Sequence, residues 1–492
     1  MENVLPSIPT QISFLKNVQY LMLQDVKDGI IPTQIGLMTQ LQTLVLISNN
    51  VSLPPQLGDL NLSSIIIQGN VNNFPNLTGS RSLSALNINS PTMTGTIPSY
   101  LKNFPIETLF IQYTQLEGTF PSWLGSLSEL KNLVFASNEN LEGTIPFEIG
   151  CGCTKLSIFQ IIANPKITGS LPPQLGLLGN LESLVIERTG ISGTVPMEYG
   201  GTKNRFDERY QWCLQTPPNF NEEKNNALIF VMNSNPGISG TIPPELSHPQ
   251  ISTLYMHSNS LSGTIPVELM MSSTLTNIHL YSNQLGGTLP FFNESKIRTL
   301  SAFNNKISGT IPIELARVST LDVSNNLLTG PLPKIIPKNF KVSGNQLNGT
   351  IPYEYCNYPF LYGIYLGGNL SGCYYNCKSL RFGNSSTSSC DLKGSTFGCN
   401  SLCGAPPGCN ANCNDIYNTF PYDDPTPEPP PSPPCSFSQS STHSPSSLVT
   451  FTNLQYDIQS NLLWNSFTSI NSTINLLSNT TTTIIGGGFF QD

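Results

Sequence analysis

The sequence of 492 residues predicts an α/β solenoid, in which short coils stack into one elongated body. Two observations predict it: a proline-marked phrase recurs at nearly constant spacing, and leucines stand at fixed offsets from it. The phrase is Asn, an aliphatic residue and then Gly-x-aliphatic-Pro, and its copies at Pro312 and Pro333 lie 21 positions apart. Most steps are 19 to 26 residues, and the step from Pro196 to Pro243 is double. The marker prolines are Pro9, Pro32, Pro54, Pro75, Pro98, Pro121, Pro146, Pro172, Pro196, Pro243, Pro266, Pro290, Pro312, Pro333 and Pro352.

Each repeat contains an alternating L-x-L core, as in STLDVSNNLLTGPLP at 319–333. Alternation puts the leucines on one face of a short strand. Stacking then joins the strands into one parallel sheet, with about 4.8 Å between coils. No single coil can bury its leucines, so the apolar core exists only in the stack. The full unit, L-x-x-L-x-L-x-x-N-x-L-x-G-T-I-P-x-x-L, has the leucine-rich repeat signature.

The rest of the repeat turns the chain back on itself. The Asn after the strand can use its amide to bond backbone groups that neighbouring coils leave unpaired. Gly permits the turn, and Pro fixes φ where no backbone donor is needed. We expect the following segment to close the convex side as a short helix or 3₁₀ turn. Glutamates recur at its start, where the positive end of a helix favours carboxylates; they are Glu148, Glu198, Glu245, Glu268, Glu314 and Glu354.

The G-x-I-P form of this repeat resembles the plant-type extracellular leucine-rich repeat proteins, such as polygalacturonase-inhibiting proteins and receptor-kinase ectodomains. The resemblance covers about residues 5–372. It implies a right-handed superhelix with a concave ligand face and a second small sheet beside the first. The paired-cysteine N-terminal cap of that family is missing, and the chain starts within a repeat without a signal-peptide pattern. We therefore expect a mature chain or a fragment.

The double step holds an insertion at 200–226, which carries eight charged residues together with Tyr210, Trp212 and Cys213. Two interpretations stay open: a loop tolerated on the convex side, or an island loop that helps to bind ligand, as in some receptor ectodomains of the family. Cys213 can pair with Cys151 or with Cys153, which would hold the loop across two coils and leave one cysteine over. The sequence does not choose between these pairings.

Three segments follow the solenoid of residues 1–372. A cysteine-rich segment at 373–420 is predicted to cap the open apolar end of the stack. A proline-rich linker at 421–434 is predicted to form a semi-rigid polyproline II spacer. The Ser/Thr/Asn-rich segment at 435–492 has strand-like pieces and is either the start of another β domain or disordered.

Cysteines and glycosylation sequons both predict an oxidising, extracellular environment. The C-x3-C spacings in the cluster also fit zinc, but no histidine lies nearby, so we predict disulfides and no metal. The disulfide candidates are Cys151, Cys153, Cys213, Cys356, Cys373, Cys377, Cys390, Cys399, Cys403, Cys409, Cys413 and Cys435. The N-glycosylation candidates are Asn50, Asn61, Asn76, Asn293, Asn348, Asn369, Asn384, Asn471 and Asn479.

The variable strand positions should be exposed on the concave face, and two columns of them can be followed from coil to coil. In three adjacent coils these positions are Tyr255, His257, His279, Tyr281 and Phe303. Aromatic and histidine side chains on an open sheet suit the binding of peptides or sugar rings. The alternative is that the rings only cover neighbouring strands as cross-strand pairs.

A third column is the residue before the aliphatic position in G-x-I-P. It is threonine at positions 96, 119, 144, 194, 241, 264, 288, 310 and 350. A stacked threonine array is typical of ice-binding solenoids. It is equally explained by the preference of threonine for extended backbone.

Composition and motifs exclude several function classes. A net charge of −8 with only 11% charged residues argues against nucleic acid, and no apolar run is long enough to span a bilayer. No catalytic motif is recognisable, so we predict neither an enzyme nor a cofactor. The sequence favours a secreted or cell-surface recognition module that binds a protein, peptide or polysaccharide on the concave face. The alternatives are a self-assembling structural or adhesive matrix glycoprotein and, after it, an ice-binding protein.

Overall fold

The structure is a computed structural model that describes residues 8–24, 26, 29–47, 51–200, 213, 228–291, 294–350, 352, 354–355, 363–366, 369–370, 389–391, 409–410 and 482–485. The chain divides into two units, one comprising Met1–Asn414 with Thr482–Asp492 and the other Asp415–Thr481. The second unit, with the proline-rich linker, lies outside the described residues, as does most of the cysteine-rich segment. The predicted boundaries of these segments therefore stay predictions.

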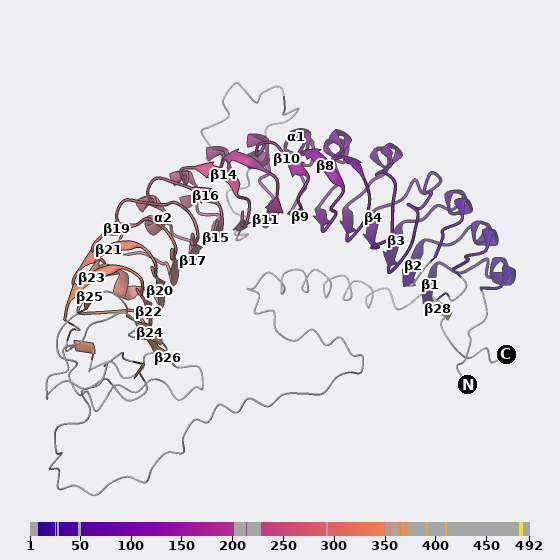
Figure 1. The fold of residues 1–492 in the computed structure, drawn as a ribbon. Helices are drawn as coiled ribbons and strands as arrows, with labels where there is room; N and C mark the ends of the chain where they lie inside the picture. The colour runs from indigo at the N-terminus through magenta and orange to yellow at the C-terminus, as the bar shows by residue number, and fades with distance from the viewer. Residues whose placement is uncertain are drawn as a thin grey trace, which may run out of the picture. The chain divides into compact units, whose positions relative to one another are not determined.

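The repeats build one parallel sheet along the inner side of the arc, with one strand from each coil (Figure 1). Register is maintained from coil to coil, so that Leu254 pairs with Ile278 and Ile278 with Leu300. The order is β28 (Thr482–Ile485), β1 (Tyr20–Gln24), β2 (Thr43–Ile47), β3 (Ser64–Gln68), β4 (Ala85–Asn89), β5 (Thr108–Gln112), β7 (Asn132–Ala136), β9 (Ile158–Asn164), β11 (Ser183–Thr189), β13 (Leu228–Val231), β15 (Ile251–Tyr255), β17 (Asn277–His279), β18 (Thr299–Ser301), β20 (Thr320–Asp322), β22 (Asn339–Lys341), β24 (Gly363–Tyr365), β26 (Ser389–Asp391) and β27 (Cys409–Asn410).

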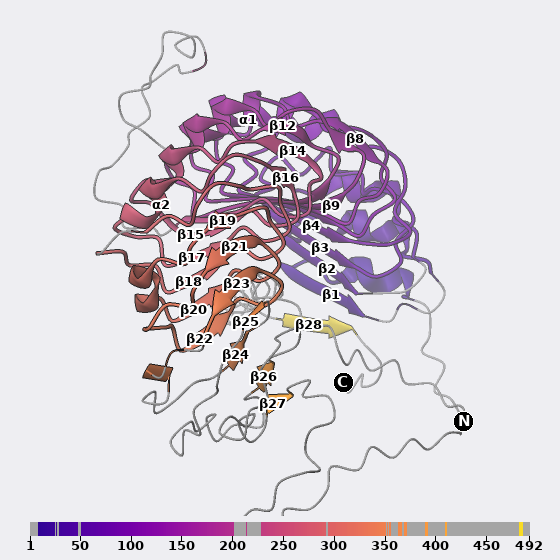
Figure 2. The ribbon, with the colours of Figure 1, turned by 60° about the vertical axis from the view of Figure 1, so that its left-hand side comes forward.

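Shorter strands form a second layer of parallel pairing beside the main sheet (Figure 2). Most of them follow the asparagine of their coil and lie at or near the glycine of the repeat; in the coils of β6 and β12 a threonine, Thr114 or Thr189, takes the place of the asparagine. The three groups are β6 (Gly118–Thr119), β8 (Leu141–Thr144) and β10 (Ile167–Thr168); β12 (Ser192–Thr194), β14 (Gly237–Gly240) and β16 (Ser260–Leu261); and β19 (Ser308–Gly309), β21 (Leu327–Gly330), β23 (Gln346–Gly349) and β25 (Asn369–Leu370). They correspond to the second small sheet that the family resemblance implies.

One-turn helices cover the outer side of the coils (Figure 1). A marker proline with extended backbone stands at the N-cap of most of them, as Pro266 does before α2 with φ −62° and ψ 134°. The prediction of a short helix or 3₁₀ turn is confirmed. The described helices are η1 (Thr10–Phe14), η2 (Thr33–Leu37), η3 (Pro55–Asp59), η4 (Ser99–Asn103), η5 (Ser122–Ser126), α1 (Glu148–Gly152), η6 (Pro173–Leu177), η7 (Met197–Gly200), η9 (Pro244–Ser247), α2 (Val267–Met271) and η10 (Ile313–Arg317).

The leucines of the strands form one continuous apolar column between the sheet and the helices. Leu254, Ile278 and Leu300 are fully buried, and each lies between the equivalent residues of adjacent coils. Burial of such a side chain stabilises the fold by about 1.5–3 kcal/mol. This contribution depends on neighbouring coils, because a coil of this length has no second layer of its own.

A ladder of asparagine side chains follows the strands from Asn138 to Asn345 and connects neighbouring coils, with Thr189 in the place of the asparagine in one of them. The Nδ2 of Asn259 donates to the carbonyl oxygens of Met232 at 2.6 Å and Met256 at 3.0 Å. Its Oδ1 accepts the backbone N–H of Asn235 at 2.9 Å. The predicted role of the repeat asparagine is confirmed, and it recurs at Asn138, Asn164, Asn235, Asn283, Asn305, Asn326 and Asn345.

A disulfide joins Cys151 in α1 to Cys213 in the insertion, with the two Cα atoms 5.1 Å apart. This is one of the two pairings that the sequence allowed. The prediction of Cys153 as a disulfide candidate is wrong: it is a free, buried thiol that donates to the carbonyl oxygen of Leu124 at 3.2 Å. Burial raises the pKa of the Cys153 thiol to about 12. The side chains of the other nine cysteines lie outside the described residues.

Three of the predicted N-glycosylation sites have described side chains. Asn61 and Asn348 are exposed, while Asn76 is half-buried and donates through Nδ2 to the carbonyl oxygen of Pro55. The side chains of the other six sites lie outside the described part of the chain. Among the helices that are described, none is both long and apolar enough to cross a membrane.

We expect Asn259→Ala to lower the free energy of unfolding of the solenoid by about 1–3 kcal/mol, because the Met232 carbonyl and the Asn235 N–H lose their partner. The Met256 carbonyl keeps a bond from Asn283 Nδ2. Urea unfolding followed by far-UV circular dichroism measures this loss. Asn140→Ala is the matched control: its amide donates to Gln115 Oε1 and accepts from Lys166 Nζ, and both bonds are exposed to solvent. We therefore expect a change within about 0.5 kcal/mol. Equal effects of the two substitutions would contradict a supporting role for the ladder.

Candidate functional site

Five ring side chains project from three neighbouring coils onto the strand side of the solenoid. Tyr255 and His279 end β15 and β17, and the other three lie two residues beyond Tyr255, His279 and Ser301. Because the strands are paired in register about 4.8 Å apart, equivalent positions lie side by side. The structure therefore brings together all five residues that the sequence assigns to the patch.

The rings stack on one another. The His257 and Tyr281 rings have centroids 4.1 Å apart and planes within 10°, and Tyr281 and Phe303 are 4.4 Å apart with planes within 7°. We call His257, Tyr281 and Phe303 the aromatic ladder. Beside it, Tyr255 and His279 are 4.4 Å apart and tilted by 51°. The result is a continuous surface of rings.

Burial differs across these rings. Tyr255 is only 6% exposed and packs with Val185 and Val231 from the two preceding strands, so its predicted exposure is wrong. Large side chains on strands this close cover one another, as the alternative interpretation of cross-strand pairing expects. His257, His279, Tyr281 and Phe303 are half-buried. The aromatic ladder is therefore partly accessible to a ligand, while the buried Tyr255 packs beside it against His279.

His257 is neutral at physiological pH. Burial, and then the positive charges of His279 and Arg188, lower the pKa of His257 to about 4. Its Nδ1 lies 3.2 Å from Ser258 Oγ, and its backbone N–H donates to Asn233 Oδ1 at 3.1 Å. A neutral ring suits the stacked contact with Tyr281, because a protonated imidazole in this half-buried position would lose part of its hydration.

A charged pair borders the aromatic ladder on the N-terminal side. Glu187 has a side chain only 7% exposed, and its carboxylate lies 3.3 Å from the half-exposed guanidinium of Arg188. The coil between β11 and β15 contributes Asn233, which is fully buried. The two columns of exposed strand positions omit this coil, because the insertion doubles the repeat step before it. The apolar run at 227–232 nevertheless indicates a strand there. Beyond Phe303 the column continues with Ser324 and Ser343, so the aromatic surface ends there.

Two other predicted features are not tested by this geometry. Tyr210 and Trp212, proposed as loop contributions, lie outside the described residues. Among the residues that are described, no group of three or more His, Cys, Asp or Glu side chains is arranged to hold a metal ion.

The repeats of this chain are similar to those of plant receptors. No protein-family model matches the chain. The receptor-like kinase TMK2 of Arabidopsis thaliana is 25% identical over 275 residues, which make up 51% of this chain and 30% of that protein. The chain spans less than a third of the curated relatives it matches, which are receptor-like kinases and receptor-like proteins.

Two solved structures are similar over most of the chain. The Arabidopsis receptor kinase HAESA, in complex with the peptide hormone IDA and the co-receptor SERK1, is 26% identical with a TM-score of 0.58; the match covers 71% of this chain and 57% of that one. The leucine-rich repeat ectodomain of the Arabidopsis receptor kinase GASSHO1/SCHENGEN3 is 23% identical with a TM-score of 0.62, covering 80% of this chain and 49% of that one. The predicted leucine-rich repeat solenoid is confirmed, whereas likeness to polygalacturonase-inhibiting proteins stays a prediction.

The low pKa of His257 predicts a pH-dependent stability. In the unfolded chain a histidine takes up a proton near pH 6.5, whereas folded His257 does so only near pH 4. Stability that is fully present above pH 6.5 is therefore lost as the pH falls toward 4. His257→Phe keeps a ring in the stack and removes the proton, so we expect its melting temperature to fall less than that of the wild type between pH 7 and pH 4.5. Differential scanning calorimetry measures the melting temperatures of the wild type and the variant.

Tyr281→Phe is the control for this comparison, since it alters the same stack without removing a group that titrates in this range. Its melting temperature should follow the wild-type pH dependence. If His257→Phe and the wild type lose stability equally on acidification, His257 is not the buried neutral group described above.

Proposed function

We propose that this chain is an extracellular recognition module that binds a protein or peptide on its concave face, with the aromatic ladder as the main contact. The observation that carries the proposal is the stack of His257, Tyr281 and Phe303 on the strand side of three adjacent coils. Similarity to HAESA, solved with a peptide hormone bound, supports a ligand of this class.

The chemistry of the surface fits a partner with both apolar and polar groups. Half-buried aromatic rings provide large contact areas at low entropic cost, and such residues dominate binding energies in protein interfaces. The half-exposed guanidinium of Arg188 stands at the border of the ladder and can donate hydrogen bonds to a carboxylate or carbonyl oxygen of the ligand. An extended peptide lying across the strands would meet both within a few residues.

An extracellular setting is supported by the described chemistry. The Cys151–Cys213 disulfide requires oxidising conditions to persist. Asn61 and Asn348 are exposed sequon asparagines and thus accessible to glycosylation. The curated relatives, which include a receptor-like kinase, point to the same setting.

The double substitution Tyr281→Ala with Phe303→Ala should weaken ligand capture about tenfold or more, because each half-buried ring contributes about 1–2 kcal/mol to an interface. Selection of a random peptide display library on the wild-type protein provides the ligands, and biolayer interferometry measures their affinity for each variant. Tyr255 is left intact because its burial would confound binding with folding.

Tyr113→Ala is the matched control, since Tyr113 is a 52% exposed aromatic on a distant coil. It should bind the selected peptides as the wild type does. Selected peptides that bind the double variant with unchanged affinity would refute the aromatic ladder as the site. Wild-type protein that enriches no peptide and instead assembles into fibres would favour the structural or adhesive alternative.

A further inference from the structure

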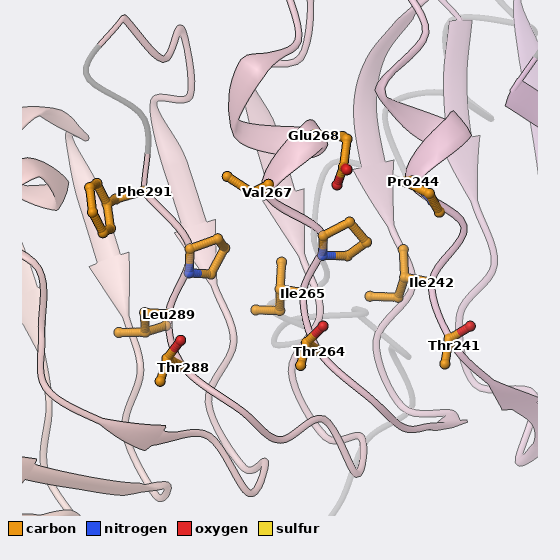
Figure 3. A pocket seen from close by; sticks show the side chains of 12 residues that line it. Thr241, Ile242, Pro244, Thr264, Ile265, Val267, Glu268, Thr288, Leu289 and Phe291 are labelled. Carbon is orange, nitrogen blue, oxygen red and sulfur yellow. The ribbon is translucent and has the colours of Figure 1, made fainter.

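A second surface lies away from the concave face, on the flank where the G-T-I-P segments meet the first turns of the outer helices (Figure 3). It is an open groove of about 650 Å³ that runs across three coils. Figure 3 shows its side chains in repeating rows: threonines along one edge, aliphatic residues and prolines on the floor, and larger apolar residues along the other edge. The groove is lined by Thr241, Ile242, Pro244, Thr264, Ile265, Pro266, Val267, Glu268, Thr288, Leu289, Pro290 and Phe291.

Thr241, Thr264 and Thr288 form a regular rail of hydroxyl groups, and all three are exposed. Their methyl groups are held by the glycine of the next coil: a Cβ at Gly263, which has φ +75°, would lie 2.8 Å from Thr241 Cγ2. The same contact recurs between Thr264 and Gly287. Contact of the methyl group with the glycine fixes the threonine rotamer, so that successive hydroxyls point the same way. Neighbouring hydroxyls are about 4.8 Å apart, which is the spacing of the coils.

The opposite edge and the floor are apolar. Ile242, Ile265 and Leu289 are almost fully buried and form the floor. Val267 and Phe291 stand 42% and 49% exposed above it. Among the described residues that line the groove, only Glu268 is charged; its exposed carboxylate lies in the first turn of α2.

We propose that this groove binds a neutral, β-linked glycan chain that lies across the coils. Pyranose rings present apolar C–H faces and hydroxyl edges, and the groove offers an apolar floor with Phe291 on one side and hydroxyls on the other. One pyranose unit of an extended chain is close in length to one coil, so successive sugars would meet Thr241, Thr264 and Thr288 in turn. Hydroxyls of the glycan can donate to Glu268, which has no cation beside it in the lining.

The same observations disfavour other ligands. An added peptide strand needs free backbone donors and acceptors, but the backbone at Thr264 and Thr288 is already bridged to Gly286 and Ser308 of the neighbouring coils. A polyanionic glycan would meet the carboxylate of Glu268 without any compensating cation. The raised Val267 and Phe291 side chains make the surface stepped, whereas an ice lattice requires a flat array.

The test is isothermal titration calorimetry of the full chain with cellohexaose and chitohexaose, two neutral β-linked hexamers. We expect binding of at least one with a Kd of about 1 mM or tighter. Phe291→Ala should weaken it about tenfold through the lost ring contact. Thr264→Val keeps the methyl on Gly287 but removes the hydroxyl, and should weaken binding about threefold to tenfold.

Two variants serve as controls. Phe147 occupies the same place after its marker proline and is 39% exposed, but it lies outside the groove, so Phe147→Ala should leave affinity within about twofold. The pair Tyr281→Ala with Phe303→Ala should also bind the hexamers normally, because it alters only the aromatic ladder. Loss of hexamer binding in that pair would assign the sugar to the concave face and overturn this proposal.

Other outcomes would overturn it as well. They are no binding of either hexamer up to about 10 mM, equal affinity of the wild type and both groove variants, or tighter binding of the polyanion hexagalacturonate. Thermal hysteresis that Thr264→Val abolishes, without glycan binding, would assign the threonine rail to ice instead.

Discussion

Stacking of one coil on the next is the constraint on which the rest of this structure depends. A leucine such as Leu254 is dry only because equivalent residues cover it from both sides. The hydrogen bonds of the backbone also depend on stacking, because Asn259 donates both to a carbonyl oxygen of its own coil and to one of the preceding coil. Burial of the leucines and hydrogen bonding of the backbone thus require the same register between neighbouring strands. A shift of one residue would expose the leucines and break these hydrogen bonds.

Fixed register converts the repeat in the sequence into columns on the surface. Residues at one offset from the repeat lie about 4.8 Å apart, so a few substitutions in adjacent coils create an extended surface of one chemistry. On the strand side, His257, Tyr281 and Phe303 become a stack of rings. On the flank, Thr241 and Thr264 become a rail, because Gly263 and Gly287 leave room for their methyl groups. The two candidate sites therefore arise from a single packing rule.

Features set by the repeat could be predicted from the sequence, and those set by side-chain packing could not. The strands, the asparagine bonds, the short outer helices and the grouping of five rings all follow from spacing alone. The burial of Tyr255 does not, because it depends on how Val185 and Val231 fill the space beside it. Likewise spacing could not choose Cys151 over Cys153, since the choice depends on which thiol faces the interior. The repeat places an exposed residue directly after most marker prolines, but the period does not determine that Phe291 is an aromatic residue at the edge of the flank groove.

The strands on either side of the insertion remain paired with each other. Although the insertion at 200–226 lies between them in the sequence, β11 and β13 pair directly, Leu184 with Phe230. The pairing of β13 with β15 shifts register once, between Leu228 and Ile229. Asn235 bonds back across the insertion, donating to the carbonyl oxygen of Ile186 and accepting from the backbone N–H of Thr189. Meanwhile the Cys151–Cys213 disulfide ties the insertion to the outer side, where α1 lies. Because the ladder of bonds continues unbroken past this point, the coil of Asn233 and those of His257 and Tyr281 keep the alignment that stacking of the rings requires.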